Sequence, residues 1–292
     1  MRITVASGKG GTGKTMVAAS LARVWDAPVT AVDLDVEEPN LHLFLHPALT
    51  GGETAVLEIP VAEESLCSHC RACAELCQFK AITVLGDVLL TFPEMCHGCG
   101  GCLAVCPDQA LRPGTRELGR VVWGSAGRIN FIMGRLRVGE AMSPPLIRAV
   151  KQKLEVLRLS LNRDVILDAP PGVSCPAVNA VMDADAVVLV TEPTPFGLHD
   201  LKLAVEAFSP LDLPLGLVIN RGGVGDRAVY EYAASADLPI LTEIPYDRRI
   251  AEAYSQGRIV AEACPEYQTV FVDLMGRIRS LARPETGARR VA

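Results

Sequence analysis

Short apolar runs alternate with longer segments of helical periodicity along most of the chain. The apolar runs predict buried strands, and the longer segments predict helices that connect one strand to the next. Strands are expected over residues 2–6, 29–33, 121–123, 129–133, 165–168, 186–191, 215–220 and 240–244. Helices are expected after residue 15 and over 144–161, 198–208, 226–236, 249–256 and 267–281. This alternation is typical of an α/β fold with a mainly parallel, doubly wound sheet.

The alternation is interrupted between residues 41 and 112. Residues 41–64 carry scattered turn residues and predict irregular structure, and a cysteine-rich composition follows. We therefore predict one α/β domain, formed by residues 1–62 and 113–282, with a small domain inserted at 63–112. The polar and basic residues 283–292 predict a flexible tail.

Eight cysteines in the insertion follow one spacing twice. Cys-x-x-Cys-x-x-Cys-x-x-x-Cys occurs first at Cys67, Cys70, Cys73 and Cys77, and again at Cys96, Cys99, Cys102 and Cys106. Three thiolates at this spacing can hold three corners of a four-iron cluster, while the fourth cysteine of each run binds the other cluster. The spacing thus predicts one [4Fe–4S] cluster on Cys67, Cys70, Cys73 and Cys106, and a second on Cys77, Cys96, Cys99 and Cys102.

This arrangement resembles bacterial two-cluster ferredoxins, although Gln78 stands where proline is usual. The alternative is zinc. Structural zinc sites favour two separated Cys-x-x-Cys pairs, so two runs of four cysteines favour iron.

A phosphate-binding loop follows the first predicted strand. Gly8-Lys9-Gly10-Gly11-Thr12-Gly13-Lys14-Thr15 fits G-x-x-x-x-G-K-[ST] and leads through Met16 into a helical pattern. Glycines let successive N–H groups surround a phosphate, Lys14 reaches the β- and γ-phosphates, and the Thr15 hydroxyl can bind Mg²⁺. The alternative is a glycine-rich turn with a chance lysine. The strand before it and the helix after it favour the site for a nucleoside triphosphate.

Carboxylates end two other predicted strands. Asp33 and Asp35 follow one strand, and Asp168 ends another just before Ala169-Pro170-Pro171-Gly172. Ligands of open α/β sheets bind outside the carboxyl ends of the strands, so these groups are expected near the phosphates. Capping of the following segment is the alternative reading for Asp33 and Asp35.

Lys9, the second lysine of the loop, makes the loop similar to the motif of a known family. K-G-G-T-G-K-T resembles the deviant Walker A motif of the MinD/ParA/nitrogenase-iron-protein superfamily, and D-A-P-P-G and T-E-P-T-P-F-G-L-H-D agree with it. With the eight cysteines, the chain resembles MinD-superfamily ATPases that contain an inserted two-cluster ferredoxin domain. A solvated surface residue is the other reading of Lys9.

The resemblance implies a role for each matching residue. Lys9 would reach the phosphates of a dimer partner, and Asp35 would orient the attacking water. Thr15, Asp33 and Asp168 would support Mg²⁺, and the Gly172 N–H would sense the γ-phosphate. The adenine would be held by Asn220, Arg221, Pro245, Tyr246 and Asp247, which could otherwise be strand caps.

Cys175 lies outside the cysteine-rich insertion. It has the same offset from Asp168 as a cluster-binding cysteine of the nitrogenase iron protein, while Glu140 occupies the place of that protein's other cluster cysteine. We hypothesise that Cys175 from two subunits holds a labile or transferred cluster, with Glu140 or exogenous ligands completing it. Simple packing is the alternative, since free cysteines are often buried small residues.

Composition limits the possible functions. A net charge of −6 with no basic stripe argues against nucleic acid as a partner. No apolar run is long enough for a membrane span and no signal peptide is evident, so a cytoplasmic location is expected. We expect a Mg-ATP-dependent, homodimeric ATPase coupled to electron transfer to a redox or iron–sulfur partner protein. An iron–sulfur carrier of the Mrp/Nbp type is the alternative, and a positioning ATPase of the MinD or ParA type is a weaker one.

Overall fold

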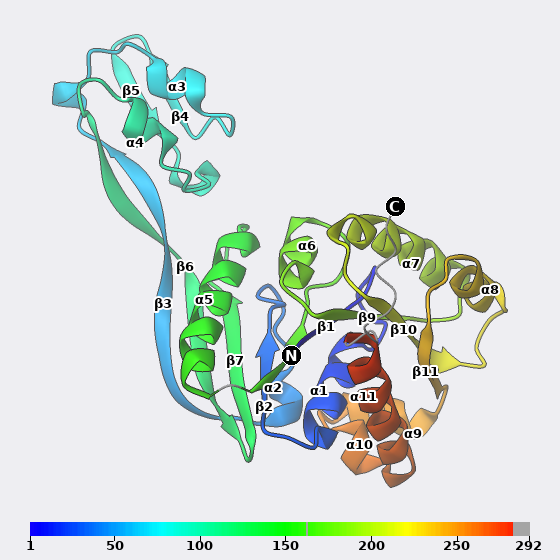
Figure 1. The fold of residues 1–292 in the computed structure, drawn as a ribbon. Helices are drawn as coiled ribbons and strands as arrows, with labels where there is room; N and C mark the ends of the chain where they lie inside the picture. Colours follow the sequence, from blue (N-terminus) through cyan, green and yellow to red (C-terminus); the bar gives the residue numbers. More distant parts are fainter. Residues whose placement is uncertain (162, 283–292) are drawn as a thin grey trace.

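A nine-stranded sheet forms the centre of the computed structural model, which describes residues 1–161 and 163–282. Its strand order is β11-β10-β9-β1-β8-β2-β7-β6-β3 (Figure 1). Strands from β11 to β7 pair in parallel, and β6 runs antiparallel to both β7 and β3. The strands are β1 (Arg2–Ala6), β2 (Val29–Asp33), β3 (Ala48–Ala62), β6 (Leu111–Ala126), β7 (Ile129–Leu136), β8 (Asp164–Asp168), β9 (Ala186–Thr191), β10 (Leu215–Gly222) and β11 (Ile240–Pro245).

Helices cover both faces of the sheet, as the doubly wound prediction requires (Figure 1). One face carries α1 (Lys14–Val24), α2 (His42–Leu45), α9 (Arg248–Ser255), α10 (Val260–Ala263) and α11 (Gln268–Ala282). The other carries α5 (Ser143–Leu161), α6 (Cys175–Val181), α7 (Pro195–Phe208) and α8 (Ala228–Ser235). Two apolar cores result, one on each face, and they hold the strand ends in place.

Strands β3 and β6 form a long antiparallel ribbon that leaves the sheet at its edge (Figure 1). The prediction of irregular structure for residues 41–64 was wrong over most of this range, because Ala48–Ala62 is one strand. Its turn-forming residues are tolerated at a sheet edge. Pro60 lies opposite Pro113 of β6, so neither removes a hydrogen bond that its partner needs, and Gly51 leaves space that Trp123 fills.

The ribbon carries the cysteine-rich tip, residues 63–110, at its far end (Figure 1). The tip repeats a short 3₁₀ turn and a short helix: η1 (Glu64–Leu66) with α3 (Ala72–Leu76), then η2 (Pro93–Met95) with α4 (Gly101–Val105). Between them lies the hairpin of β4 (Ile82–Leu85) and β5 (Val88–Thr91). The Glu63 N–H donates to the Ala110 carbonyl at 2.8 Å and closes the unit. The predicted tail, 283–292, lies outside the described residues.

Candidate functional site

The loop between β1 and α1 is shaped by glycines that pack against backbone and side chains. Gly13 has φ 94°, and a Cβ there would lie 2.3 Å from the Asn220 amide nitrogen. A Cβ on Gly8 would lie 2.1 Å from the Asp200 carbonyl oxygen. The loop therefore fits its surroundings only with glycine at these positions, and its N–H groups stay available for an anion.

Asn220 fastens this loop from the end of β10. Its buried side-chain amide donates to the Thr12 carbonyl at 2.8 Å. The residue is thus close to the phosphate-binding loop, as expected, and it positions the loop directly. Its predicted contact with adenine stays a prediction.

Lys14, Asp168 and Asp33 meet in a buried group at the carboxyl ends of β2 and β8. Lys14 Nζ donates to Asp168 Oδ1 at 2.6 Å, and Asp33 lies opposite Asp168 in the parallel register. Burial opposes the charge of Lys14, but the Asp168 carboxylate outweighs it and raises the lysine pKa. Burial, reinforced by Asp168, raises the pKa of Asp33 to about 8. Asp33 also accepts the N–H groups of Asp35 and Leu41, at 3.0 and 2.9 Å.

The same group fits Mg²⁺. Asp168 Oδ2 is buried and has no hydrogen-bond partner among the described residues, and Thr15 lies in the first turn of α1. A carboxylate oxygen, a hydroxyl and the oxygens of a bound triphosphate are ligands that Mg²⁺ prefers. Asp35 lies beside this group, and burial raises its pKa to about 6 against the opposing effect of Lys14.

Gly172 and Lys9 occupy the rim of the phosphate site. The Gly172 N–H donates to the Ser7 carbonyl at 2.9 Å, so the predicted γ-phosphate sensor is bound to the loop. The Ser7 hydroxyl donates to the Lys9 carbonyl at 2.8 Å. Lys9 itself is half-exposed, and its side chain makes no ion pair within the part of the chain that the structure describes. It is therefore accessible to another molecule.

A pocket beside the loop lies where the adenine was expected. It is lined by Gly11, Gly13, Met16, Asn220, Arg221, Pro245, Tyr246, Asp247, Ile250, Ala251 and Tyr254. Asp247 caps α9 by accepting the Arg249 N–H at 2.8 Å, and it accepts the Tyr267 hydroxyl at 2.8 Å. The Asp247 carboxylate is engaged in these bonds. A ligand in the pocket can therefore contact the backbone of 245–247 and the exposed Tyr246 ring.

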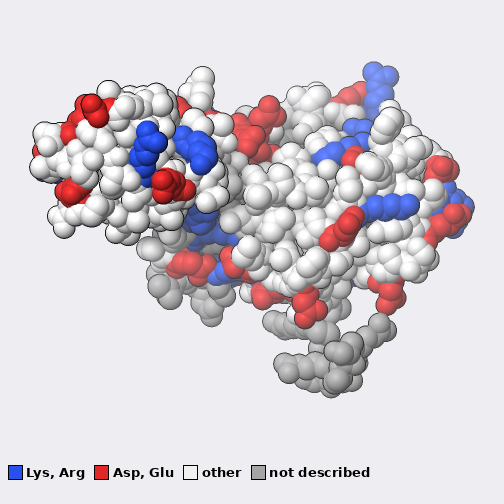
Figure 2. Space-filling view, turned by 90° about the horizontal axis from the view of Figure 1, so that it is seen from above, with Lys and Arg blue, Asp and Glu red and all other residues white. Residues whose placement is uncertain are grey.

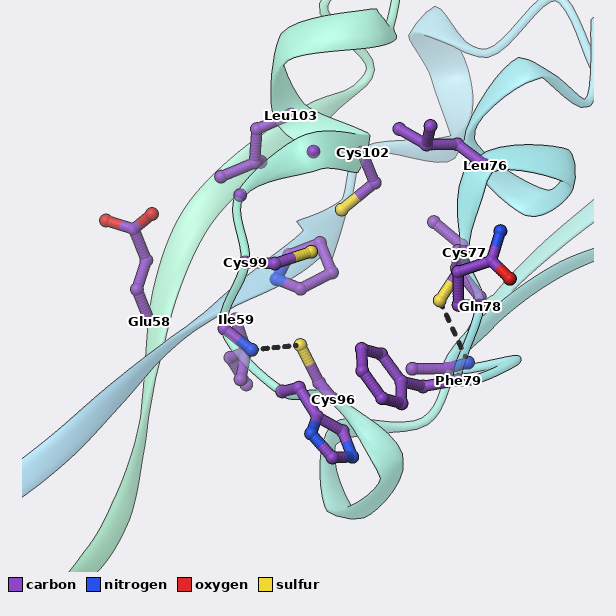
Figure 3. Close-up of a pocket in the computed structure, with 17 residues that line it drawn as sticks. Glu58, Ile59, Leu76, Cys77, Gln78, Phe79, Cys96, Cys99, Cys102 and Leu103 are labelled. Atoms are coloured by element: carbon purple, nitrogen blue, oxygen red, sulfur yellow. Dashed lines mark hydrogen bonds between the residues drawn. The ribbon is translucent and has the colours of Figure 1, made fainter. Parts of the chain in front are cut away.

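In the cysteine-rich tip, the four cysteines predicted for the second cluster line one cavity (Figure 3). Cys96, Cys99 and Cys102 come from the second run, and Cys77 comes from the first, opposite them. Cys77 thus lies at the same cavity as the three cysteines of the second run, and the crossed cluster assignment stays a prediction. Phe79 and His97 stack at the same cavity, with ring centroids 3.5 Å apart.

Backbone N–H groups point at four of the cysteine sulfurs in matching pairs. His69 and Gly98 donate to Cys67 and Cys96 two residues earlier, both at 3.4 Å. Ala81 and Ala110 donate to Cys77 and Cys106 four residues earlier, both at 3.3 Å. The bonds to Cys77 and Cys96 are the dashed lines of Figure 3. Such bonds stabilise thiolate charge, which is what a cluster ligand carries.

Three of the other four cysteines of the tip lie close together. Cys73 is buried in an apolar cluster against which Cys67 and Cys106 pack, as do Cys77 and Cys102 of the other set. Burial raises the pKa of the Cys73 thiol, and Cys106 and Cys67 add to this effect. Cys70 is exposed. These other four cysteines are the residues predicted for the first cluster.

No group of three or more His, Cys, Asp or Glu side chains within residues 1–161 and 163–282 is placed to hold a single metal ion. A four-iron cluster differs from a single ion, because each iron takes its own thiolate and the four cysteines surround the group. The cavity bounded by Cys77, Cys96, Cys99 and Cys102 has this character, so its donor set fits a [4Fe–4S] group.

Glu140 and Cys175 are engaged very differently. The Glu140 carboxylate is buried and pairs with Arg116 Nη1 at 2.7 Å. Cys175 is exposed at the first position of α6. A ligand role for Glu140 would break its buried pair, so we do not propose it again. Cys264 is buried under α11, which agrees with a structural role.

The sequence did not indicate the contacts that hold the site together. Asp200 packs on Gly8, and Arg116 reaches both Glu140 and the Cys96 carbonyl. Each contact joins residues that are far apart in the chain or on different elements, so no local sequence pattern predicts it.

The fold and the phosphate-binding loop define a P-loop NTPase. More narrowly, the profile of the CobQ/CobB/MinD/ParA nucleotide binding domain family matches residues 3–260, so the chain belongs to this family. A relative in Methanocaldococcus jannaschii, itself uncharacterized, is 31% identical over 267 residues, which are 88% of this chain and 90% of the relative. The septum site-determining protein MinD of Pyrococcus horikoshii, solved in complex with Mg-ADP, shares the fold: TM-score 0.58, 23% identity, 96% of both chains.

Two shorter matches are to proteins with iron–sulfur names. An iron–sulfur cluster carrier protein of Aquifex aeolicus is 26% identical over 138 residues, 42% of this chain and 38% of the carrier. A polyferredoxin protein of Methanocaldococcus jannaschii is 44% identical over 39 residues, 13% of this chain and 39% of that protein.

None of the helices described is both long and apolar enough to span a membrane. On the face shown in Figure 2, Lys and Arg side chains are scattered among Asp and Glu rather than gathered in one patch.

Proposed function

We propose that this protein is a Mg-ATP-hydrolysing, homodimeric ATPase that couples its nucleotide state to electron transfer through two [4Fe–4S] clusters. The observation that carries the proposal is the cavity lined by Cys77, Cys96, Cys99 and Cys102. It lies on the same chain as a phosphate-binding loop and is joined to it by the β3–β6 ribbon. The polyferredoxin match supports it over a short length.

In this proposal, residues 63–112 are an inserted two-cluster ferredoxin domain. Cys67, Cys70, Cys73 and Cys106 hold the first cluster, and Cys77, Cys96, Cys99 and Cys102 hold the second. When bound, such clusters store and pass on single electrons at low potential. The chain's own contribution is to exclude water on the buried side and to donate N–H groups to the cysteine sulfurs.

In the nucleotide site, Lys14 and the loop N–H groups bind the phosphates, and Thr15, Asp33 and Asp168 support Mg²⁺. The ion, when bound, neutralises charge on the β- and γ-phosphates. Asp35 orients the attacking water, and the half-exposed Lys9 completes the site of the dimer partner. The Gly172 N–H then exchanges its bond to the Ser7 carbonyl for one to the γ-phosphate. Adenine lies in the pocket between Asn220 and Tyr246.

The partner is a redox or iron–sulfur protein, and we propose neither nucleic acid nor membrane as a partner. The net charge of −6 and the scattered basic residues support this. The proposed location is the cytoplasm.

A cluster carrier is the second candidate function, and exposed Cys175 beside the nucleotide-facing segment 168–172 favours it. The match to the Aquifex aeolicus carrier also points this way. Against it, clusters held entirely by cysteines of one chain are poor cargo.

Iron and sulfide analysis of anaerobically reconstituted protein separates these proposals. We expect about eight iron atoms per chain, falling to about four in Cys99→Ser/Cys102→Ser, because each cluster holds four. Cys175→Ser should keep all of the iron. Bound zinc, or iron unaffected by the double substitution, would refute the cluster proposal. Additional labile iron that disappears with Cys175→Ser would favour the carrier.

A further inference from the structure

We propose that Arg116 is a positioning residue that transmits the nucleotide state to the Cys96 loop of the cysteine-rich tip. Arg116 lies on β6, outside both the nucleotide site and the cysteine sets. The inference rests on the proposed function, because it says how the two sites communicate.

Arg116 joins the tip to the nucleotide-binding body. Its side chain is 7% exposed; Nη1 donates to Glu140 Oε2 at 2.7 Å, and Nη2 lies 3.5 Å from the Cys96 carbonyl oxygen. Nη2 also lies 3.6 Å from the Met142 sulfur, and Met142 packs against the apolar cluster that contains Cys96. One buried guanidinium thus contacts a predicted cluster ligand and the segment that leads into α5.

Glu140 ties Arg116 to the turn before α5. Its side chain is 1% exposed. Oε1 accepts the N–H groups of Ala141 and Met142, at 3.1 and 2.9 Å, while Oε2 binds Arg116. The two charged side chains are buried, so a displacement of the turn must displace Arg116 or break a buried ion pair.

The connection between Arg116 and the nucleotide site begins beside Asp35. The Val36 carbonyl accepts the Leu136 N–H at 2.9 Å, and the next N–H, of Arg137, donates to the Leu118 carbonyl of β6 at 2.9 Å. Val36 also fills the space that a side chain on Gly134 would need. The segment that contains the proposed water-orienting Asp35 is therefore bonded, through the end of β7, to the strand that carries Arg116.

A second route reaches the same turn from the other nucleotide-facing segment. Residues 168–172 lead into α6, and α6 packs against α5. Lys151 of α5 donates to the Asn179 carbonyl and pairs with Asp183 at 3.0 Å. The segment 168–172 is thus connected, through α6, to the helix that begins just after the turn that holds Glu140.

Because Arg116 is charged, this connection affects how readily the nearby cysteine site accepts an electron. Reduction by an external one-electron donor such as dithionite adds one negative charge to the group held by Cys77, Cys96, Cys99 and Cys102. A guanidinium at the Cys96 carbonyl favours the added charge, and Glu140 offsets the guanidinium. A movement that changes the Arg116–Glu140 pair therefore changes how readily an electron is accepted.

Two measurements on the cluster-loaded, full-length protein test this. The first is the dissociation constant of a non-hydrolysable Mg-ATP analogue for oxidised and for dithionite-reduced protein. The second is amide exchange of Gly98, Arg137 and Met142 with and without the analogue. Glu140→Gln keeps an oxygen for the two turn N–H groups but loses the ion pair, and Arg116→Lys keeps the charge but cannot make both contacts. Arg112→Gln, which removes the exposed Arg112–Glu63 pair of the same ribbon, is the control.

In the wild type and Arg112→Gln, we expect the two dissociation constants to differ by roughly fivefold or more, and Gly98 exchange to respond to the analogue. In Glu140→Gln and Arg116→Lys, the two dissociation constants should become nearly equal, and Gly98 exchange should no longer respond to the analogue. Iron content should be retained. If either variant keeps its iron and also keeps both wild-type responses, the inference is overturned and the proposed function still stands. A wild type that binds the analogue without any change at these three amides would overturn the inference together with the proposed coupling.

Discussion

The two lysines of the phosphate-binding loop have opposite surroundings. Lys14 is buried against Asp168, whereas Lys9 is half-exposed and its side chain makes no ion pair with the described residues. We expect Lys9→Ala to abolish ATP hydrolysis without changing the melting temperature, because its proposed contact lies in the partner. Lys14→Ala should abolish hydrolysis and also destabilise the fold by about 3–5 kcal/mol, since it leaves the Asp168 charge buried alone. Hydrolysis assays and thermal unfolding of both variants check this; wild-type hydrolysis in Lys9→Ala would refute the role across the dimer.

Asp247 predicts a pH dependence of stability. Hydrogen bonds from the Arg249 side chain, then from its N–H and from the Tyr267 hydroxyl, hold the pKa of this carboxyl well below its usual range. A lowered folded-state pKa contributes stability above the ordinary aspartate pKa of about 3.9, and the contribution is lost as the pH falls toward the folded-state value. Asp247→Asn keeps the helix cap and removes the charge. Its melting temperature should be below that of the wild type at pH 7, with the gap narrowing progressively as the pH falls below about 4; a gap that is constant with pH would contradict this.

Spacing along the chain predicted that Cys77 would lie with Cys96, Cys99 and Cys102, and the four line one cavity. The partners of Asn220 and Glu140 could not be predicted in this way. Asn220 bonds to Thr12, 208 residues away, and Glu140 pairs with Arg116 on β6, 24 residues away. These contacts depend on which strands become neighbours, and local patterns do not contain that information.

At the scale of elements, the predicted parallel strands and long helices were confirmed within a few residues, whereas only residues 121–123 of the β3–β6 ribbon were predicted as strand. Gly51, Gly52 and Pro60 are typical of turns, yet here they lie in a strand at the sheet edge. The β3 edge is not paired on its outer side in the described sheet, so such residues cost little there. Local propensity was overridden by the pairing with β6.

The duplication within the tip was also visible in sequence, and the backbone follows it. His69 and Arg71 have positive φ in the first loop, and Gly98 and Gly100 have it at the same positions of the second. The first loop therefore adopts with ordinary residues a conformation that favours glycine, which is typical of a segment held by a site.

Gly51 tests the packing of the ribbon. A Cβ at this position would lie 2.5 Å from the Trp123 ring, and Lys153 lies over the same ring at 3.4 Å from its centroid. We expect Gly51→Val to destabilise the protein by roughly 1–3 kcal/mol, the usual cost of overpacking. Thr54→Val, at an exposed position of β3, should change the free energy of unfolding little. Denaturant titration of both variants measures this, and equal effects would contradict the packing argument.

At the scale of the whole molecule, a nucleotide-binding body and a cysteine-rich tip are held apart by the ribbon and joined again at Arg116 and Glu140 (Figure 1). The tip is inserted after the segment that carries Asp33 and Asp35, and we propose that a change at the γ-phosphate acts on the base of the ribbon. This geometry favours ATP acting on the cysteine sites over two independent activities on one chain.

The most direct test of this coupling is an anaerobic redox titration, followed by electron paramagnetic resonance, of iron-loaded protein with and without Mg-ATP. Lys14→Ala, with its iron content verified, is the control that should not respond. We predict that ATP shifts a midpoint potential by roughly 60 mV or more, which is about 1.4 kcal/mol for one electron. Potentials that stay the same with ATP, in a protein that hydrolyses it, would refute the coupling.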